Sequence, residues 1–367
     1  MFVTSLSVSD FRNLTDAHLD PAPAGTTVIT GRNGSGKTSL LEAVAYLATL
    51  QSFRGSPREA LVRSGTRSAI VRGVTVVGDR TVDIDAEIVP TGRSRTLVNR
   101  QPARRRSDLH DALRVSVFSP EDIGVVRGGP AERRRFLDEA LAIVDPRSAA
   151  AGDEVDKVLR QRAALLRQAR GTLSPEVTAT LDVWDARLDH AGTALVEARE
   201  ALVAQLVPLV IEHSVRLADR EVDVGLWYRR SWSGSLRDAL VASRADDVAR
   251  GVTTVGPHRD DLDLTLAGLA SRSHASQGEQ RSLALALRLA AHQLATERLG
   301  TAPVLLLDDV FSELDPHRSR ALVAGLPAGQ ALLTTAVPLP PEVVASQTYL
   351  VGPDGQVHAG HGSTGTW

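Results

Sequence analysis

Residues 31–38 read GRNGSGKT, and this stretch decides the fold class. Every fixed position of the phosphate-binding spacing G-x-x-x-x-G-K-T is present. A β-branched run precedes the stretch at 26–30, and apolar residues recur at helical spacing over 39–49. A buried strand, a glycine-rich turn and a helix N-terminus together bind phosphate through backbone N–H groups. The sequence therefore predicts a nucleotide-binding α/β domain.

The residues of this phosphate loop have different expected tasks. Lys37 is placed to contact the β- and γ-phosphates, and the hydroxyl of Thr38 is placed to ligate Mg²⁺. A polar turn after an N-terminal strand brings two further candidates for nucleotide contact, for which a solvated strand end is the alternative. The expected ATP-binding residues are Arg12, Asn13, Gly31, Arg32, Asn33, Gly34, Ser35, Gly36, Lys37, Thr38 and Ser39.

A short apolar run at 303–307 ends in two carboxylates, Asp308 and Asp309. This is the pattern of a central parallel strand buried on both faces. Asp308 is expected to join Thr38 in the Mg²⁺ shell, and Asp309 is expected to orient the attacking water, so that Asp309 and Lys37 are the catalytic residues. Aspartate is one methylene shorter than the glutamate usual in transporter ATPases, so slow hydrolysis is expected. The alternative is an aspartate pair that caps the next turn.

The segment SQGEQ at 276–280 precedes a helical pattern over 281–299. A capped helix N-terminus there would be a second anion site. The phosphate loop already encloses its own nucleotide, so this signature segment is expected to contact the γ-phosphate held by a second copy of the chain. An ordinary helix cap is the alternative for the segment taken alone. The expected seam residues are Ser276, Gln277, Gly278, Glu279 and Gln280, followed by Ser312 and Asp315.

Composition bounds the class of protein. The 367 residues allow two domains, the hydrophobic content is an ordinary 43%, and there is no cysteine, so a disulfide framework and a thiolate metal site are excluded. No secretory leader pattern opens the sequence, and no apolar stretch is long enough to span a bilayer. We expect a cytoplasmic protein.

The net charge of −2 does not by itself indicate nucleic acid. Lysine occurs only at Lys37 and Lys157, and the remaining positive charge is arginine, which gathers in clusters suited to phosphate. A solvated face and a GC-rich genome are the alternative explanation. A cluster at 133–135 is expected instead to pair with neighbouring carboxylates. The expected DNA contacts are Arg54, Arg93, Arg95, Arg104, Arg105 and Arg106.

Patterns along the chain predict a split nucleotide-binding head. Alternating residues over 71–87 and 95–99 indicate an antiparallel layer, and 131–217 is mostly helical with a break at Pro208. The head is expected at 1–130 and 245–367, with a helical arm at 131–244. Residues 260–266 should return the chain to the head, and the glycine-rich tail from 352 should be loose.

Several longer stretches carry a family resemblance. They are FRNL at 11–14, SFRG at 52–55, FSPED at 118–122, RRRFLD at 133–138 and TVGPHRDD at 254–261. From residue 1 to about 350, the chain resembles the RecF family of bacterial recombination mediators, which is itself similar to SMC-type and ABC-type ATPase heads. The resemblance implies an α/β P-loop ATPase head with an antiparallel β layer and an inserted helical arm.

The resemblance also implies a function. Such proteins dimerise on DNA when they bind ATP, at gaps or single-strand/double-strand junctions, and work with RecO and RecR to load RecA. ATP acts as a switch that slow, DNA-stimulated hydrolysis resets. Two features depart from ABC heads: Ser119–Asp122 stands where such heads often carry Gln, and Thr335 stands where a transporter carries His. Thr335 is expected to hold the γ-phosphate more weakly.

Two other function classes remain open. A transporter ATP-binding subunit is disfavoured by the antiparallel layer, the helical arm and the missing His. An ATP-sensing DNA scaffold with negligible hydrolysis is not separated from a clamp by the sequence. His258 has no Cys or His partner at metal-ligand spacing, so a structural hydrogen bond is expected for it.

Overall fold

The computed structural model describes residues 1–103, 106–326 and 328–360. Its backbone contacts divide the chain into two compact units. The first unit comprises Met1–Asp122, Arg216–Ala218 and Ala291–Trp367, and the second comprises Ile123–Val215 and Asp219–Ala290.

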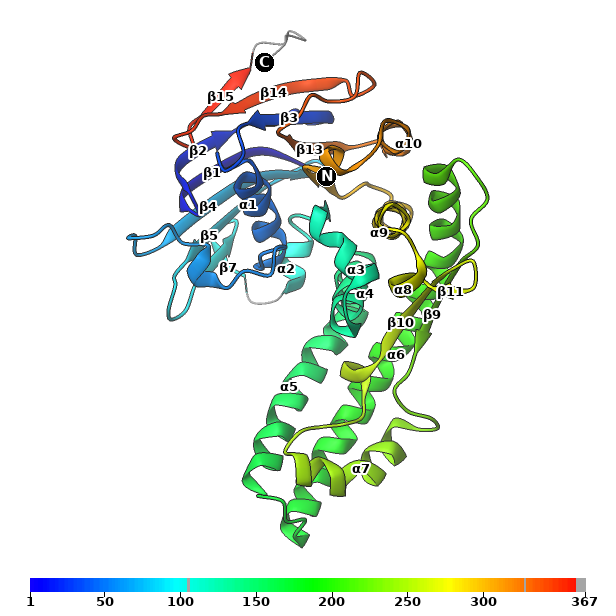
Figure 1. Cartoon of the computed structure of the whole chain (residues 1–367). Helices are drawn as coiled ribbons and strands as arrows, with labels where there is room; N and C mark the ends of the chain where they lie inside the picture. The colour runs from blue at the N-terminus through cyan, green and yellow to red at the C-terminus, as the bar shows by residue number, and fades with distance from the viewer. Residues whose placement is uncertain (104–105, 327, 361–367) are drawn as a thin grey trace. The chain divides into compact units, whose positions relative to one another are not determined.

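One sheet of the first unit is antiparallel, with the strand order β2-β1-β4-β5-β6-β7 (Figure 1). Apolar residues alternate along its strands, so one face of the sheet is buried in the core. The tight turn between its last two strands passes through Asn99 and Arg100, which both have positive φ. The strands are β1 (Phe2–Phe11), β2 (Leu14–Leu19), β4 (Ala69–Val77), β5 (Arg80–Ile88), β6 (Arg95–Val98) and β7 (Gln101–Pro102).

The other sheet of the first unit has the order β15-β14-β3-β13-β12-β8. All its strands except β15 run parallel, so the carboxyl ends of β3, β13 and β12 meet at one edge. The acidic strand β12 is buried along its whole length, as expected for a central strand. The strands are β3 (Gly25–Gly31), β8 (Val115–Phe118), β12 (Val304–Asp308), β13 (Gln330–Thr335), β14 (Ala345–Val351) and β15 (Val357–Gly360).

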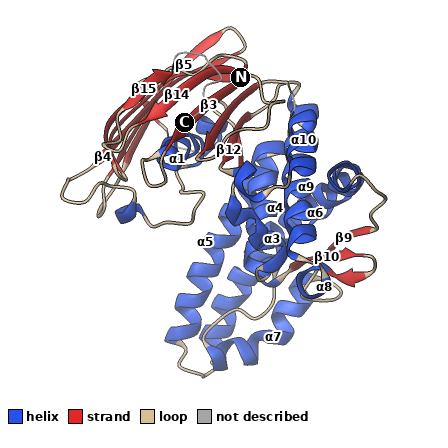
Figure 2. Ribbon diagram, turned by 45° about the horizontal axis from the view of Figure 1, so that its top comes forward, coloured by secondary structure: helices blue, strands red, loops and turns tan. Residues whose placement is uncertain are grey.

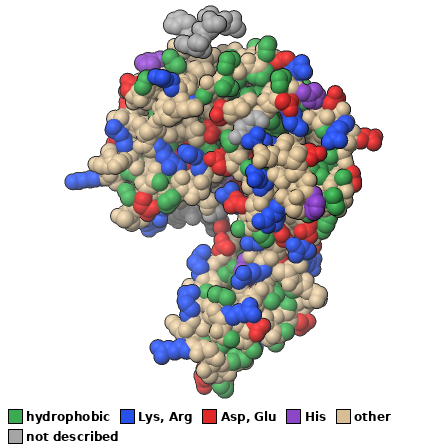
Figure 3. All heavy atoms as spheres, in the orientation of Figure 1, with side chains coloured by type: hydrophobic (Ala, Val, Ile, Leu, Met, Phe, Trp, Pro, Cys, Tyr) green, Lys and Arg blue, Asp and Glu red, His purple; other side chains and the backbone are tan. Residues whose placement is uncertain are grey.

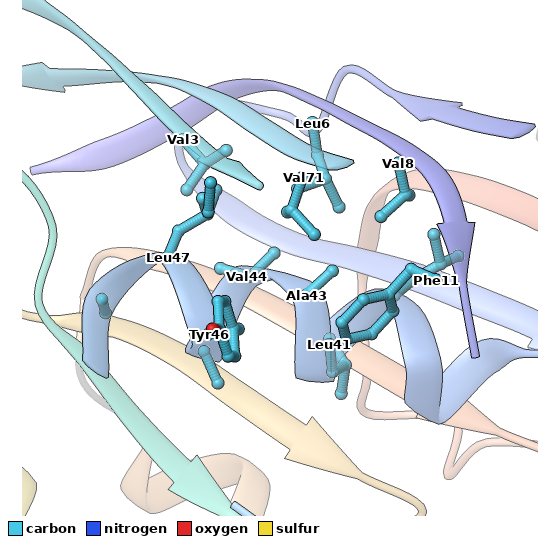
Figure 4. Packing of buried hydrophobic residues seen from close by; sticks show 14 of the residues in the cluster. Val3, Leu6, Val8, Phe11, Leu41, Ala43, Val44, Tyr46, Leu47 and Val71 are labelled. Atoms are coloured by element: carbon cyan, nitrogen blue, oxygen red, sulfur yellow. The ribbon is translucent and has the colours of Figure 1, made fainter. Parts of the chain in front are cut away.

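Helix α1 (Lys37–Thr49) lies between the two sheets (Figure 2). Its apolar side chains meet those of β1 and β4 in the core of the unit (Figure 4). This packing fixes the start of α1, and with it the phosphate loop, against the ends of the parallel strands. The smaller elements are η1 (Arg58–Ala60), α2 (Arg106–His110), η2 (Pro120–Asp122), η4 (Val310–Glu313) and α10 (Pro316–Gly325).

The second unit is mostly helical. Contacts of Arg162 with Asp185 and of Glu154 with Arg187 show that α5 and α6 run antiparallel. A three-stranded sheet of order β11-β10-β9 lies in the same unit. The elements are α3 (Ile123–Arg127), α4 (Pro130–Val144), α5 (Pro146–Gln168), α6 (Pro175–Ala218), β9 (Val224–Arg229), α7 (Leu236–Arg250), η3 (Pro257–Arg259), β10 (Asp261–Leu266), β11 (Leu269–Ala270) and α8 (Ser271–His274), and α9 (Gln277–Leu299) begins there.

Two expectations about local structure are wrong. Pro208 does not break the helix, because the flanking Leu206 and Val210 are fully buried and their packing outweighs the one hydrogen bond that proline removes. The tail is not loose over 352–360, because β15 pairs with β14 through a turn in which Gly352 donates its N–H to Gln356, and the rest of the tail lies outside the described residues.

The compact units differ in extent from the head and arm expected from the sequence. Residues 245–290 group with the helical unit, since β10 pairs with β9 and α7 packs against α5. The segment 260–266 therefore does not return the chain to the first unit. The functional division into head and arm stays a prediction.

Candidate functional site

In the phosphate loop, Lys37 forms hydrogen bonds to backbone oxygens of the loop itself. The amino group of Lys37 donates to the carbonyl oxygens of Gly31 at 2.8 Å and Arg32 at 3.0 Å. Burial lowers the pKa of Lys37, while the nearby Asp309 and Asp308 oppose that shift. The amino group of Lys37 thus lies among backbone oxygens that a phosphate ligand would replace as its partners.

Glycine is required at Gly36, where the chain enters α1. Its φ is 114°, and an added Cβ would lie 2.5 Å from a methyl carbon of Leu14. The loop residues Arg32, Asn33 and Gly34 are exposed, while Ser35 and Ser39 are buried. The loop therefore packs its inner side against the FRNL turn and leaves its outer side open.

Asn13 joins the FRNL turn to the phosphate loop. Its side-chain N–H donates to the Gly34 carbonyl at 2.9 Å, and its oxygen accepts from the Ser39 hydroxyl at 2.9 Å. Arg12 faces elsewhere and forms a bidentate pair with the fully buried Glu42, at 2.7 and 2.6 Å. Asn13 is thus part of the loop's framework, and Arg12 fastens that turn to α1. A nucleotide contact by either residue stays a prediction.

Arg12 also holds the segment that follows α1. Its guanidinium donates to the Ser56 hydroxyl at 2.8 Å and to the Ala60 carbonyl at 3.0 Å. The hydroxyl of Ser52 donates to Glu42 and accepts from the N–H of Arg54. The SFRG stretch is therefore a constrained loop that presents Arg54 at the surface.

Asp308 meets the phosphate-loop helix at the edge of the sheet. Its Oδ1 accepts hydrogen bonds from the hydroxyls of Thr38 at 2.8 Å and Thr334 at 2.7 Å. Burial raises the pKa of Asp308, and the charges of Glu121 and Asp309 add to that rise, while the two hydroxyl groups oppose it. The structure thus brings together Thr38 and Asp308, the two residues predicted to share the metal.

These groups fit a magnesium ion. Mg²⁺ prefers oxygen ligands and is commonly held by one or two protein oxygens together with phosphates and water. A threonine hydroxyl and a carboxylate 2.8 Å apart beside a phosphate loop supply such oxygens. Thr38 and Asp308 are therefore the residues that would hold the ion.

Asp309 has an unusual backbone and an unpaired oxygen. Its φ of 47° lies in the left-handed region, which Asp and Asn tolerate better than most residues. Its Oδ1 is buried and has no hydrogen-bond partner within the described part of the chain. A carboxylate oxygen left free beside the metal ligands suits the predicted task of orienting water.

Two further residues lie near this site although the sequence analysis assigned neither of them a role there. Glu121 follows β8, where ABC heads often carry Gln, and its charge reaches Asp308. Thr334 lies beside Asp308, whereas the hydroxyl of the expected Thr335 is engaged with the backbone of Val337 at 2.7 and 3.1 Å. Thr334 lies beside Asp308 because of the register in which β13 pairs with β12. A single sequence does not show this register, so it offered no signal for Thr334.

The signature segment has the hydrogen bonds of a capping box. The N–H and hydroxyl of Ser276 both donate to Glu279, at 2.9 and 2.8 Å, and the N–H of Glu279 donates back to the Ser276 hydroxyl at 3.3 Å. Gln280 is buried and donates to the carbonyls of Ser271 and Arg272, at 3.1 Å each. Gln280 thus holds α8 against the start of α9.

Ser276 and Gln277 are exposed, and Gln277 and Gly278 begin α9. This segment belongs to the second unit, whereas the phosphate loop belongs to the first. Farther along, the Ser312 hydroxyl donates to the Asp309 carbonyl at 2.8 Å, and Asp315 caps α10 by accepting from the Arg318 N–H at 2.9 Å. That these residues face a second copy stays a prediction.

Three exposed arginines lie close together on two adjacent loops of the first unit, and they are Arg54, Arg58 and Arg93. Arg58 makes long hydrogen bonds to the Gly92 carbonyl at 3.4 Å and the Ser94 hydroxyl at 3.5 Å, which places the Arg54 loop beside the Arg93 loop. Within the described chain these arginines have no carboxylate partner. Arg58 was not foreseen as a member of this cluster.

The other expected DNA contacts lie in and after β6. Arg95 stands opposite Glu87 in the strand register, so its charge is partly balanced. Arg104 and Arg105 lie outside the described residues, and so does the side chain of Arg106. Figure 3 shows basic and acidic side chains interspersed over the visible face, in agreement with the small net charge.

The RRR cluster is engaged within the second unit. Arg133 forms a buried bidentate pair with Asp261 at 2.7 and 2.9 Å, and Arg134 donates to the Asp260 carbonyl at 2.7 Å. Arg135 pairs with Glu132 and Glu139, at 2.7 and 3.6 Å. Arg135 therefore makes the contacts with neighbouring carboxylates that were expected for the cluster. For Arg133 and Arg134 the expectation is wrong, because α4 packs against β10 and these two side chains join the RRRFLD and TVGPHRDD stretches instead.

His258 makes the structural hydrogen bond expected for it. Its Nε2 lies 3.0 Å from the Thr253 carbonyl, so Nε2 carries the proton and donates. Burial lowers the pKa of His258 and so favours the neutral ring. The described residues contain no cluster of side chains that could hold a metal through His, Cys, Asp or Glu alone.

Comparison with known proteins identifies the family. The chain matches the family described as "RecF/RecN/SMC N terminal domain" over residues 2–332. A protein of Frankia alni named DNA replication and repair protein RecF is 45% identical over 358 residues, which cover 92% of this chain and 94% of that protein. A protein of the same name from Acidothermus cellulolyticus is 40% identical over 98% of this chain and 99% of its own length.

Solved structures agree. A structure described as the recombination mediator protein RecF-ATP in the RecFOR pathway aligns with a TM-score of 0.87 at 27% identity, covering 98% of this chain and 99% of that chain. An Smc head domain from Pyrococcus furiosus shares the fold, with a TM-score of 0.56 at 16% identity over 98% of this chain and 95% of its own. The predicted α/β head of the ABC/SMC type is confirmed. No helix among the described residues is long and apolar enough to cross a membrane. The chain belongs to the RecF family of SMC-type ATPase heads.

Proposed function

We propose that this chain is an ATP-dependent DNA clamp of recombinational repair and replication-fork maintenance. The proposal rests mainly on one observation. Beside a complete phosphate loop, the Thr38 hydroxyl donates to Asp308, and the next residue, Asp309, has a buried carboxylate oxygen without a hydrogen-bond partner among the described residues. Relatives named DNA replication and repair protein RecF and the ATP-bound RecF structure support the same conclusion. The protein binds ATP with Mg²⁺ and hydrolyses it slowly, with DNA stimulating the reaction.

The proposed chemistry divides among few side chains. Lys37 exchanges its backbone partners for the phosphate oxygens of ATP. Thr38 and Asp308 hold Mg²⁺, which neutralises phosphate charge when bound. Asp309 accepts a hydrogen bond from the attacking water through its free oxygen. The short reach of aspartate keeps turnover low, so ATP serves as a switch.

Two copies are needed to complete the site. A helix N-terminus that offers backbone N–H groups and a serine hydroxyl is an anion site, and Ser276 stands exposed at such a terminus. In the proposed homodimer it contacts the γ-phosphate of the partner, with Ser312 and Asp315 at the same seam. The clamp works on single- and double-stranded DNA at gaps or junctions in the cytoplasm, with RecO and RecR as partners in loading RecA.

Light-scattering mass tests the switch. With Mg²⁺-ATP the native chain is expected to dimerise, and gapped duplex DNA is expected to strengthen the dimer. Lys37→Met is expected to remain monomeric, because it removes the only phosphate-loop ammonium. Lys157→Met is a matched control, since Lys157 is the only other lysine and is exposed in α5.

The outcomes of the light-scattering measurement separate the clamp from its alternatives. A dimer that needs both ATP and Lys37, and that tolerates Lys157→Met, supports the clamp. A native chain that stays monomeric in every condition contradicts it and favours a subunit of a hetero-complex. A dimer that forms equally with Lys37→Met shows that association does not depend on nucleotide.

DNA contact by the arginine cluster has its own test. Each of the variants Arg54→Ala, Arg58→Ala and Arg93→Ala is expected to make the DNA-binding constant less dependent on salt. The plot of log K against log salt should become shallower by about one unit, because the variant protein releases roughly one counterion fewer when it binds DNA. Sequence preference should not change. Fluorescence anisotropy with labelled duplex measures the slope, and Arg135→Ala is the control because Arg135 is paired with two glutamates. An equal effect of Arg135→Ala would contradict this location of the DNA surface.

A further inference from the structure

The hydroxyl of Thr334 contacts both acidic residues of the site. It is fully buried, donates to Asp308 Oδ1 at 2.7 Å and accepts from the Asp309 N–H at 3.1 Å. The same N–H also lies 3.2 Å from the Thr334 carbonyl. One side chain thus fixes the carboxylate of Asp308 and the left-handed backbone of Asp309.

The sheet topology explains this placement. Strand β13 lies between β3, which leads into the phosphate loop, and β12, which ends in Asp308. Thr334 is in register with Asp308 on one side and with Ile29 on the other. In-register residues of parallel strands point to the same face, and Ile29 belongs to the core that contains α1. Thr334 therefore faces the start of α1, and the next residue, Thr335, faces away.

We propose that Thr334 is a positioning residue for the metal–nucleotide site, which orients Asp308 towards the ion and Asp309 towards water. The inference rests on the proposed function, because it presupposes Mg²⁺-ATP hydrolysis. The inference goes beyond that function, because it assigns the orientation of Asp308 and Asp309 to the hydroxyl group of Thr334. Asp308 Oδ1 has two hydroxyl donors, and only Thr334 also bonds to Asp309. Thr334 touches neither nucleotide nor metal in this scheme and acts through the two carboxylates.

The competing explanation is that Thr334 only satisfies a buried hydrogen bond of the fold. Thr334→Val removes the hydroxyl and keeps the shape, whereas Thr334→Ser keeps the hydroxyl and removes a methyl group. If the hydroxyl positions the carboxylates, Thr334→Val should weaken Mn²⁺ binding to the protein–AMP-PNP complex and lower turnover by about 10- to 100-fold, as for other groups that orient metal ligands. Thr334→Ser should stay within about threefold of the native chain.

Electron paramagnetic resonance of Mn²⁺ with the full chain and AMP-PNP measures the metal affinity without relying on activity. Binding of a fluorescent ATP analogue in EDTA should be unchanged, because the phosphate loop is intact. Thr75→Val is the matched control. Thr75 is also fully buried, and its hydroxyl donates to the Ala112 carbonyl at 2.8 Å in the antiparallel layer, so its loss lowers stability without weakening Mn²⁺ binding.

Native-like Mn²⁺ affinity in Thr334→Val would overturn the inference, and so would equal losses in Thr334→Val and Thr334→Ser. If Thr334→Val does not fold, Thr334→Cys, with a weak S–H donor of similar shape, should give an intermediate loss, and native-like affinity there would equally overturn it. A native chain without metal-dependent nucleotide binding would instead contradict the proposed function. The two failures are therefore distinguishable.

Discussion

Replacing Arg162 by leucine is expected to lower the free energy of unfolding of the second unit by about 3–5 kcal/mol, as for other buried ion pairs that lose one partner. Arg162 is fully buried in α5 and donates to Asp185 at 2.9 Å and to Asp247 at 2.6 Å. It also donates to the Thr253 hydroxyl at 2.8 Å. The network joins α5, α6 and α7 to the segment that leads into the TVGPHRDD stretch. Without the guanidinium, Asp247 remains buried and loses its cation.

Urea unfolding followed by tryptophan fluorescence measures this change. Three of the four tryptophans, Trp184, Trp227 and Trp232, lie in the second unit, so the signal reports mainly on it. Arg160→Leu is the control, because it makes the same replacement at an exposed position of the same helix and should change stability by no more than about 0.5 kcal/mol. Equal stability of Arg162→Leu and the native chain would show that the network contributes nothing net.

Local patterns were sufficient to predict the elements that build the nucleotide site. The strand, loop and helix over 25–49 follow from a β-branched run, a fixed glycine spacing and helical periodicity, and the structure places β3 and α1 there. The acidic end of β12 was predictable for a similar reason, since a fully apolar run ending in carboxylates is typical of a central parallel strand. Each of these signals lies within about a dozen residues.

Interactions between distant residues were not predictable in the same way. Arg133 and Asp261 are 128 positions apart, and nothing near either residue in the sequence indicates that they pair. The same holds for the contacts of Thr334 with Asp308 and Asp309, which depend on strand register. The pattern over 260–266 correctly indicated a strand but not its partner, because alternation reports burial on one face and not which strand lies alongside.

Replacing Asp309 by asparagine is expected to reduce ATP hydrolysis by about 10²- to 10⁴-fold, the range typical for loss of a group that handles the proton of the attacking nucleophile. The amide keeps the shape of the side chain and loses the basic oxygen. Asparagine is chosen over alanine because φ at this position is 47°, where Asn is tolerated and alanine adds strain. The loss can therefore be assigned to the chemistry of the carboxylate.

The same variant should lengthen the life of the ATP-bound dimer in proportion to the lost hydrolysis. Single-turnover hydrolysis and the decay of the dimer mass after an ADP chase measure the two quantities on one sample. Asp79→Asn is the control, because Asp79 lies exposed in the turn between β4 and β5 and should leave both unchanged. Asp308→Asn should behave differently, losing metal-dependent nucleotide binding together with hydrolysis, because it removes a predicted metal ligand.

The comparison of Asp309→Asn with the native chain also separates a hydrolysing clamp from an ATP-sensing scaffold. In a clamp, the free oxygen of Asp309 sets how long two copies remain joined, so its loss traps the dimer on DNA. In a scaffold, nucleotide exchange sets that time, and Asp309→Asn leaves the dimer's lifetime unchanged even though the residual hydrolysis falls. A trapped dimer would therefore show that hydrolysis at this site opens the clamp, whereas an unchanged lifetime would show that ATP binding alone carries the signal.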